Sequence, residues 1–484
     1  MPNLQNEGTD SYTKGDLLSE RNISDARDKI NLQLGNCLLA PPLLCLAIMV
    51  MGKEARSAGT HTGANGFRPI DYVKIAIFGF ALAALWGSLH TIILQVRLLD
   101  FVAEWQKNTY LGLLSGTGLI LAMAVQPIAG AISDRSGFRW GRRRPYILLG
   151  TILALLFMPG IGLCGSYATL FIIYCLLQVS CNISQGPYQG FIPDLVPGQK
   201  RGVASGVKSL LEIVGAVALV RLIAPFMQRY FTGGGSSWLW LALTMPAILL
   251  LGTMIATILT VKERPGVGGA KLPMLSILYK SFRIDVKATP DFIWFLVSRL
   301  LVFMAFDTLQ RFALYFLMDV VGISSPAAVT ADLLLVVGIC MVVVVYPAGR
   351  LSDKVGRRPI VLSSMLLGAL GIVVLFFSRS YGHIILSGGL LGISSGAFMS
   401  ANWALAIDLL PKGEEARYLG LTNLATAGAA ALALFSVGPA IDFFNTYSPN
   451  LGYSVMLLVC FICFVVGSVL LMKIKGRVNQ DSGV

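Results

Sequence analysis

The sequence GAISDRSGFRWGRRRPYI, residues 130–147, decides how this chain is organised. An apolar run ends just before Asp134, and a second one begins after the arginine cluster of Arg135, Arg139, Arg142, Arg143 and Arg144. Cations crowded between two runs of membrane length must lie in water, and basic residues gather in cytoplasmic loops. The stretch therefore predicts a cytoplasmic loop that joins two membrane-spanning helices.

A shorter copy of this loop, GRLSDKVGRRPIV, occupies residues 349–361 and again separates two apolar runs. Pro145 corresponds to Pro359 at the same offset in numbering that relates Gly206 to Gly420, and the first loop is longer by five residues. Ion pairs in such loops can form in one conformation and open in another, which makes a two-state element. We predict a conformational gating motif made of Gly130, Asp134, Arg135, Gly141, Arg142, Arg143, Gly349, Asp353, Gly356, Arg357, Arg358, Asp194 and Asp408.

The composition is that of an integral membrane protein. The chain has 484 residues, of which 55% are hydrophobic and 13% are charged, whereas soluble domains carry about 25% charged residues. A net charge of +13 suits a nucleic-acid partner in a soluble protein. Here the basic residues lie in alternate loops. We therefore interpret the excess of positive charge as a signal of membrane topology and as contact with anionic lipid, and we expect no nucleic acid as partner.

Nothing in the sequence indicates an enzyme, a cofactor or a metal site. The eight cysteines lie in apolar stretches, where we interpret them as small hydrophobic residues. The three histidines do not cluster, and no nucleophile–base pair is evident. The glycine-rich phosphate loop that would indicate ATP as the direct driver is also missing.

Twelve apolar segments are long enough to cross a bilayer. The first six cover residues 73–96, 109–132, 146–164, 168–192, 208–228 and 238–261, and the second six cover 292–316, 330–348, 359–377, 383–407, 417–437 and 453–473. Because the two halves share motifs at one offset, we predict two six-helix repeats in parallel, which is a layout of secondary transporters. The predicted fold class is all-α, with twelve transmembrane helices in two pseudo-repeats.

The chain divides accordingly into five parts. They are a polar tail at 1–72, a first half at 73–261, a basic central loop at 262–291, a second half at 292–476 and a tail at 477–484. Basic residues favour one side, so we expect both termini in the cytoplasm, in a plasma or inner membrane, and a monomer. The apolar segment 37–51 is short and contains Pro41 and Pro42, so we favour an interfacial or re-entrant segment over an extra span.

The fourth span carries the best candidate for solute binding. Gln178, Asn182, Gln185 and Gln189 recur at helical spacing and share one face. Four amides offer donors and acceptors to a neutral polyhydroxyl solute. Such amides can also form hydrogen bonds between helices in membranes. We favour the interpretation that these four line a cavity. Gly186-Pro187 among them is expected to bend the helix.

The seventh span carries Arg299, Asp307, Gln310 and Arg311. Asp307 and Arg311 have the spacing of an ion pair, with the acid first. A buried carboxylate resists ionisation unless it is paired, which suits a carrier of protons. Asp307 with Arg311 is therefore the predicted site of ion coupling, and a permanent pair between them would make both structural instead.

Other intramembrane polar residues complete the candidate site. Trp86 and His90 in the first span lie one helical turn apart, and His90 could exchange protons near neutral pH or be a hydrogen-bonded wall residue. Asn402 and Trp403 in the tenth span correspond to Tyr188 and Gln189, and the Trp403 indole could stack on a sugar ring or pack like any aromatic. Arg299 is taken as a further residue that binds solute. Arg221 in the fifth span needs an acidic partner or water.

The doubled G-x-x-x-D-x-x-G-R-R loop resembles that of the major facilitator superfamily, from residue 73 to about 475. Within it, VQPIAGAISDRSGFRWGRRRPYI is similar to the loop of sucrose transporters in the glycoside–pentoside–hexuronide cation symporter group. The fourth span, CNISQGPYQGFIPDL, resembles theirs through Asn182, Gln185, Gly186, Pro187, Asp194 and Leu195. The resemblance implies alternating access by two rocking halves, with the solute between them.

Two residues depart from the sucrose-transporter pattern. An intramembrane acid of that group falls at Gln178 here, and an arginine falls at Gln189. If the group couples to protons through that acid, this chain must use another residue, such as Asp307, or couple differently.

The leading hypothesis is a secondary transporter of a neutral sugar or glycoside, coupled to H⁺ or Na⁺ with the proton preferred. One alternative is a proton-coupled exporter of amphiphilic compounds, against which the fifth span lacks the Gly-x-x-x-Gly-Pro-x-x-Gly-Gly pattern of drug antiporters. Another is a membrane sensor that binds solute without transport. The direction of transport stays open.

Overall fold

A computed structural model of the chain describes residues 68–263, 290–378, 380–409 and 415–474. The apolar segment 37–51 and most of the central loop lie outside the described residues. Residues Ile70–Val484 form one compact unit. Within the described residues, twelve helices are long and apolar enough to cross a membrane, and no strand occurs. The predicted all-α fold with twelve spans is confirmed.

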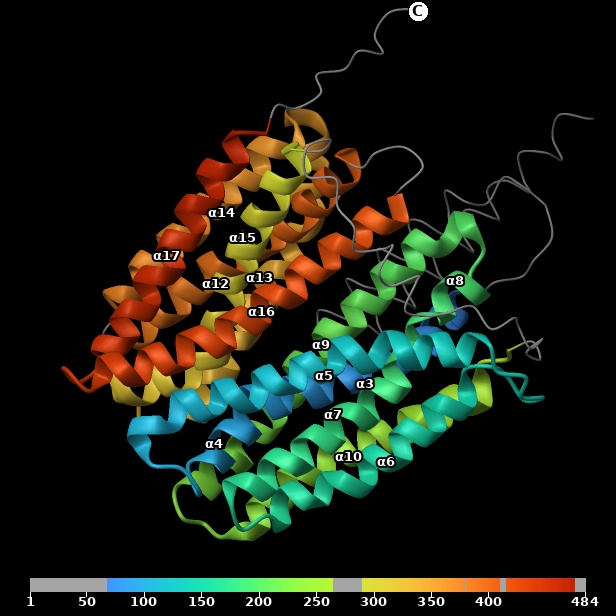
Figure 1. Ribbon diagram of the computed structural model, residues 1–484, viewed down its shortest axis with the longest axis horizontal. Coiled ribbons are helices and arrows are strands. Elements are labelled where there is room, and N and C mark those ends of the chain that lie inside the picture. The colour runs from blue at the N-terminus through green and yellow to red at the C-terminus, as the bar shows by residue number, and fades with distance from the viewer. Residues whose placement is uncertain (1–67, 264–289, 379, 410–414, 475–484) are drawn as a thin grey trace, which may run out of the picture. The chain divides into compact units, whose positions relative to one another are not determined.

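The first half contains helices α3 to α10. Its elements are α3 (Pro69–Ser88), the π-helix η2 (Leu89–Ile93), α4 (Leu94–Leu98), η3 (Glu104–Gln106), α5 (Lys107–Asp134), α6 (Arg144–Leu163), α7 (Tyr167–Gln189), α8 (Phe191–Leu195), η4 (Gly198–Lys200), α9 (Arg201–Phe231) and α10 (Ser236–Thr260). Helix α7 packs between α5 and α6, and α10 packs against α6 and α9. These helices form the lower group in Figure 1.

The second half contains helices α12 to α17. Its elements are α12 (Pro290–Phe316), the π-helix η5 (Leu317–Val321), α13 (Pro326–Val355), α14 (Arg357–Phe376), α15 (Tyr381–Asp408), α16 (Glu415–Asn445) and α17 (Leu451–Met472). Helix α15 packs between α13 and α14, as α7 does in the first half, and α12 packs against α16 and α17. The equivalent packing is the structural form of the sequence repeat.

The two halves meet chiefly along three pairs of elements. Helix α5 packs against α16, α9 against α13, and η2 against α12. Glycines allow α5 and α16 to approach closely, because a Cβ atom at Gly112 would lie 2.2 Å from the carbonyl oxygen of Leu434, and one at Gly438 would lie 2.4 Å from that of Asn108. The halves are therefore joined by direct helix packing.

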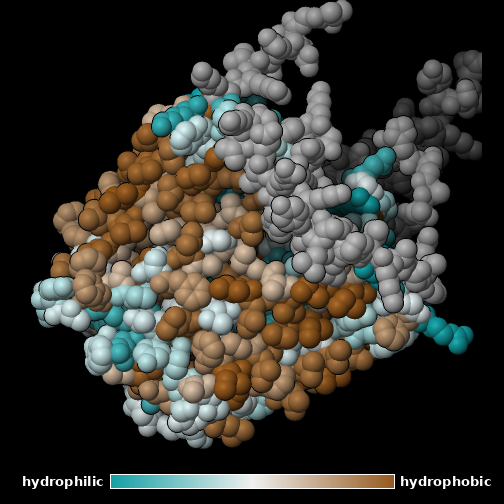
Figure 2. Space-filling view, viewed as in Figure 1, coloured by the Kyte–Doolittle hydropathy of each residue, from teal (hydrophilic) through white to brown (hydrophobic). Residues whose placement is uncertain are grey.

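The outer surface is apolar, as a membrane helix bundle requires. Large side chains such as Leu156, Leu163 and Leu259 are exposed on the helices, and Figure 2 shows hydrophobic surface along both groups of helices. Helices α9 and α13 are longer than their predicted spans of 208–228 and 330–348, because their polar ends at the loops remain helical. Membrane length sets the apolar part of a helix, and flanking residues can extend it.

Helix α7 continues through Gly186 and Pro187 and ends at Gln189. Gly190 separates it from α8, which begins at Phe191. Gly186 lies against α5, where a Cβ atom would approach the Gln126 carbonyl oxygen to 2.2 Å. At Gly190 a Cβ atom would overlap the Arg143 guanidinium. Both glycines thus serve close packing, and the second one makes room for the gating motif.

Candidate functional site

A row of hydrogen-bonded polar side chains lines the inside of the first half. His90 Nε2 lies 2.8 Å from the Tyr174 hydroxyl, and Gln178 Nε2 donates to the same hydroxyl at 2.7 Å. Asn182 Nδ2 donates to the Gln178 main-chain oxygen at 2.8 Å and lies 3.2 Å from Gln178 Oε1. We call His90, Tyr174, Gln178 and Asn182 the polar row. Because Gln178 donates to the Tyr174 oxygen, the Tyr174 proton is free to point at His90.

The π-helix η2 positions His90 at one end of the polar row. Single π turns occur often at functional sites because they change the direction of a side chain. The Trp86 ring stacks on the His90 imidazole, with centroids 5.1 Å apart and an interplanar angle of 13°. Gln95 Nε2 donates to the His90 carbonyl at 2.8 Å, which holds the wide turn. The predicted pair of Trp86 and His90 is therefore brought next to the fourth-span amides.

The second half reaches the polar row through α12. Gln95 Nε2 also donates to the Arg311 carbonyl at 2.9 Å, and the Tyr315 hydroxyl donates to the Gln95 carbonyl at 2.8 Å. The polar row thus lies where the two halves meet, with a cation of the other half beside it.

Asp307 and Arg311 do not form a closed ion pair. In the described part of the chain, neither side chain has an opposite charge within 4.0 Å. Arg311 Nη1 is buried and has no hydrogen-bond partner among those residues. Although their spacing in sequence would allow an ion pair, the two side chains remain available for other partners. Gln310, next to them, is exposed.

A second polar cluster surrounds Arg299 in the second half. The Arg299 side chain is buried, its Nε donates to Thr426 Oγ1 at 3.0 Å, and its Nη1 donates to Asn402 Oδ1. The guanidinium lies over the rings of Phe303 and Trp403, at 4.7 Å and 5.8 Å from their centroids. Asn402 Nδ2 is buried without a described partner. Arg299, Asn402 and Trp403 are thus brought together, apart from the polar row.

The four amides of the fourth span have unequal surroundings. Gln178 and Asn182 are buried in the polar row, Gln185 is half-buried, and Gln189 is exposed near the end of α7. Sequence reasoning did not select Tyr174, which links His90 to Gln178. A tyrosine one turn before Gln178 on an apolar helix gave no signal, because its partner comes from another span.

The first-half gating residues form an ion-pair cluster around Arg143. Arg143 Nε lies 2.6 Å from Asp194 Oδ2, and its Nη2 lies 2.7 Å from Asp134 Oδ1. Arg142 Nη2 also reaches Asp194, at 2.5 Å, and this carboxylate raises the pKa of Arg142. The Arg143 main-chain N–H donates to Glu263 at 2.8 Å. One buried arginine thus joins α5, α7 with α8, and the chain after α10.

The second-half copy of the cluster is reduced to one pair. Arg357 Nη1 lies 2.7 Å from Asp408 Oδ1, which is the counterpart of the bond between Arg143 and Asp194. Asp353, the counterpart of Asp134, is exposed and has no ion pair within the described ranges. Each of these ion pairs lies within one half of the molecule.

The glycines of the predicted motif have backbone or packing roles. Gly141 and Gly356 have positive φ values of 126° and 102°, which favour glycine. Gly130 lies against Gly186, Gly349 lies against Ser400, and Arg358 donates to the Met472 carbonyl. Arg135 lies at the end of α5, half-buried.

The end of the molecule opposite these loops, which we call the far end, carries a network that sequence reasoning missed. Asp442 of α16 accepts from Asn108 Nδ2 at 2.8 Å and from the main-chain N–H of Thr109 at 2.6 Å. It thereby caps the first turn of α5 from the other half. Lys107 Nζ lies 2.7 Å from Asp319 Oδ1, and the Tyr453 hydroxyl donates to Asp319 at 2.7 Å.

The α9–α13 contact adds bonds between the halves on the same side. Arg221 Nε lies 3.1 Å from Asp332 Oδ1, which supplies the acidic partner that its place in the fifth span requires. Gln228 Nε2 donates to the Ser324 carbonyl at 3.1 Å. Within the residues that the structure covers, no group of three or more His, Cys, Asp or Glu side chains is arranged to hold a metal ion.

Comparison with known proteins places this arrangement in a family. The family described as MFS/sugar transport protein matches residues 77–474. A lactose permease of Leuconostoc lactis is 20% identical over 448 residues, which is 81% of this chain and 69% of the permease. The rice sucrose transport protein SUT5 is 28% identical over 207 residues, which is 38% of this chain and 36% of the rice protein.

A solved structure has the same fold. The nucleoside transporter NupG superposes with a TM-score of 0.67 at 13% identity, and the match covers 84% of this chain and 99% of NupG. Its helices are arranged like those of the two halves described above. The chain is therefore a multi-pass membrane transporter that belongs to the MFS/sugar transport protein family, within the glycoside–pentoside–hexuronide symporter group of the major facilitator superfamily.

Proposed function

We propose that this chain moves a neutral sugar or glycoside across the membrane by alternating access, together with a coupling proton. The observation that carries the proposal is the polar row at the junction of the halves. Hydroxyl, amide and imidazole groups there hydrogen-bond one another. Such groups can exchange these bonds for bonds to sugar hydroxyls, and Trp86 beside them offers a ring face for stacking.

The distribution of bonds between the halves supports alternating access. The side-chain bonds between the halves that are given above lie between the polar row and the far end. At the basic loops, the ion pairs of the gating motif stay within one half. We infer a conformation that is closed at the far end and open towards the basic loops, which we place in the cytoplasm with both termini.

Within this proposal the clusters have different roles. The polar row with Gln185 and Gln189 contacts the solute from the first half. Arg299, Asn402 and Trp403 contact it from the second half, where Arg299 supplies donors together with Asn402 Nδ2, which has no partner among the residues described. The gating motif holds each half rigid at its basic end, so that the halves rock as units.

Asp307 is the proposed carrier of the coupling proton. It lies in α12, one turn from Arg311, and has no ion pair with any residue that the structure describes, so it can gain a proton without breaking such a salt bridge. Arg311 then favours the ionised form when the proton leaves. A carboxylate inside a span is costly unless it serves such a purpose.

Uptake of sucrose and maltose into proteoliposomes, with and without an imposed pH gradient, tests the proposal. We expect accumulation only with the gradient, and Asp307→Asn should reduce it at least about ten-fold. Glu104→Gln is the matched control, because Glu104 is exposed and lies in η3, before α5 begins. Uptake that ignores the gradient would overturn proton coupling, and no uptake of either sugar would overturn the solute class.

A further inference from the structure

The first-half loop has a tip that the gating motif does not use. Arg142 and Arg143 are engaged by carboxylates, whereas Arg139 is exposed and forms no ion pair within the described residues. Phe138 and Trp140 flank it, with 47% and 45% of their surface exposed. The tip Phe138–Trp140 falls in the region where the first loop is longer than its copy at residues 349–361, which has no aromatic residue before Pro359.

The tip is held in place rather than extended freely. Ser136 Oγ lies 2.9 Å from the Ser133 carbonyl and 2.8 Å from that of Arg142, which brings the two ends of the loop together. Phe138 packs edge-on against Tyr146 of α6, with centroids 6.2 Å apart. Arg144 donates to the Trp140 carbonyl at 3.3 Å. The two aromatic rings are thus exposed in an ordered loop.

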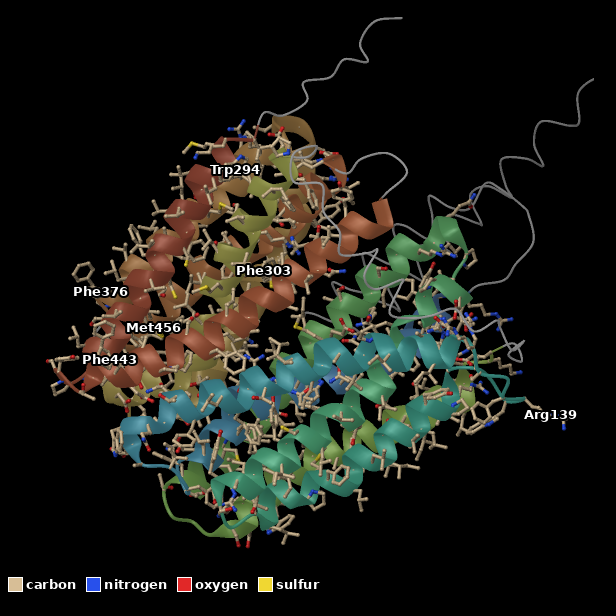
Figure 3. The ribbon with its side chains drawn as sticks, viewed as in Figure 1. Arg139, Trp294, Phe303, Phe376, Phe443 and Met456 are labelled. Carbon is tan, nitrogen blue, oxygen red and sulfur yellow. The ribbon has the colours of Figure 1, made fainter. Side chains whose placement is uncertain are left out.

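The tip continues the membrane-facing surface of the helices on either side of it. Ile128 and Ile132 are exposed on α5, and Leu149 and Ile152 are exposed on α6. Exposed apolar side chains on membrane helices suit contact with lipid tails, so we place the loop between the two helices at the level of the lipid headgroups. Figure 3 shows Arg139 directed away from the helices at this loop.

We propose that the tip Phe138–Trp140 binds the phosphate of an anionic membrane lipid. Aromatic side chains favour the membrane interface because their rings are apolar and tolerate polar neighbours. The Arg139 guanidinium presents several N–H donors in a plane that matches phosphate oxygens. A net negative headgroup adds attraction to the arginine-rich loop. The proposal does not depend on the transported solute.

Quenching of Trp140 fluorescence by brominated lipids tests this binding. The full chain is reconstituted in bilayers of phosphatidylcholine with a minor share of phosphatidylglycerol, and bromine is placed on either lipid at equal mole fraction. The Trp140 signal is the fluorescence of the unaltered chain minus that of Trp140→Phe. This subtraction cancels the fluorescence of the other tryptophans, including Trp294 beside Lys473. We expect stronger quenching by brominated phosphatidylglycerol, and about five-fold weaker lipid binding in Arg139→Gln.

Lys354→Gln in the second loop is the matched control. Lys354 is an exposed cation in the shorter copy, without aromatic neighbours in sequence, so the preference for phosphatidylglycerol at Trp140 should remain. Equal quenching by the two lipids in the unaltered chain would overturn the proposal. A preference that survives Arg139→Gln would overturn the role of Arg139. Unchanged thermal unfolding of each variant shows that the fold is retained.

Discussion

The two ends of the molecule are held together in different ways. At the basic loops, buried Arg143 ties together elements of a single half, and Arg357 does so in the other half with one bond. At the far end, Asp442 and Asp319 connect one half to the other. A bond inside one half need not break when the halves move against each other, whereas a bond between the halves stabilises only one conformation. The same chemistry therefore has structural consequences at one end and conformational consequences at the other.

The largest effect is expected from Arg143→Gln at the basic end. Removal of this buried cation leaves Asp134 and Asp194 without their shared partner, which should lower the free energy of unfolding by about 3 kcal/mol. Thermal unfolding in detergent measures the loss. Gly190→Ala should act in the same direction, because its Cβ atom would overlap the Arg143 guanidinium. Unfolding of Arg143→Gln at the original temperature would contradict the structural role of this end.

Asp442→Ala should have the next largest effect, on conformation rather than on folding. It removes the acceptor of Asn108 and of the Thr109 N–H, which should shift the balance towards opening at the far end by about 2 kcal/mol. Spin labels at the exposed residues Trp105 and Tyr447 would report a population with a longer distance between them. An unchanged distribution of distances between the labels would contradict the role of the far end in stabilising one conformation.

Arg221→Gln should sharpen the comparison with a smaller shift of the same kind. Arg221 joins Asp332 across the halves, but almost half of its side chain is exposed, so we expect about 0.5 kcal/mol. The same spin labels measure the shift. An effect larger than that of Asp442→Ala would place the main lock at the α9–α13 contact instead.

The smallest effect is expected from Arg357→Gln, the counterpart of Arg143→Gln. Arg357 and Asp408 are both partly exposed, so their pair should contribute only about 0.3 kcal/mol to the free energy of unfolding. Thermal unfolding of the two variants shows how much less the second copy of the motif contributes to stability than the first. Equal losses of stability in the two variants would mean that the burial of Arg143 does not make its ion pairs stronger than the pair of Arg357.

Local pattern in the sequence predicted the helices of this protein well. Apolar length and basic loops gave the twelve spans, because membrane thickness and the cost of charge in lipid act on each segment separately. The offset between Asp194 and Asp408 also predicted equivalent places for both acids, and each one pairs with the corresponding arginine. A bend at Gly186-Pro187 stays a prediction, since helix α7 continues through both residues and ends at Gln189, before Gly190, where Arg143 fills the space.

Contacts between distant spans could not be predicted in this way. The bond between Tyr174 and His90, the cap that Asp442 forms on α5, and the open pair of Asp307 and Arg311 all depend on how helices pack. The sequence alone determined that the chain crosses the membrane in two related sets of six helices, since that follows from solvation of each segment. Only the tertiary structure decided which polar groups meet, because a polar group buried in a membrane takes its partner from whichever helix packs beside it.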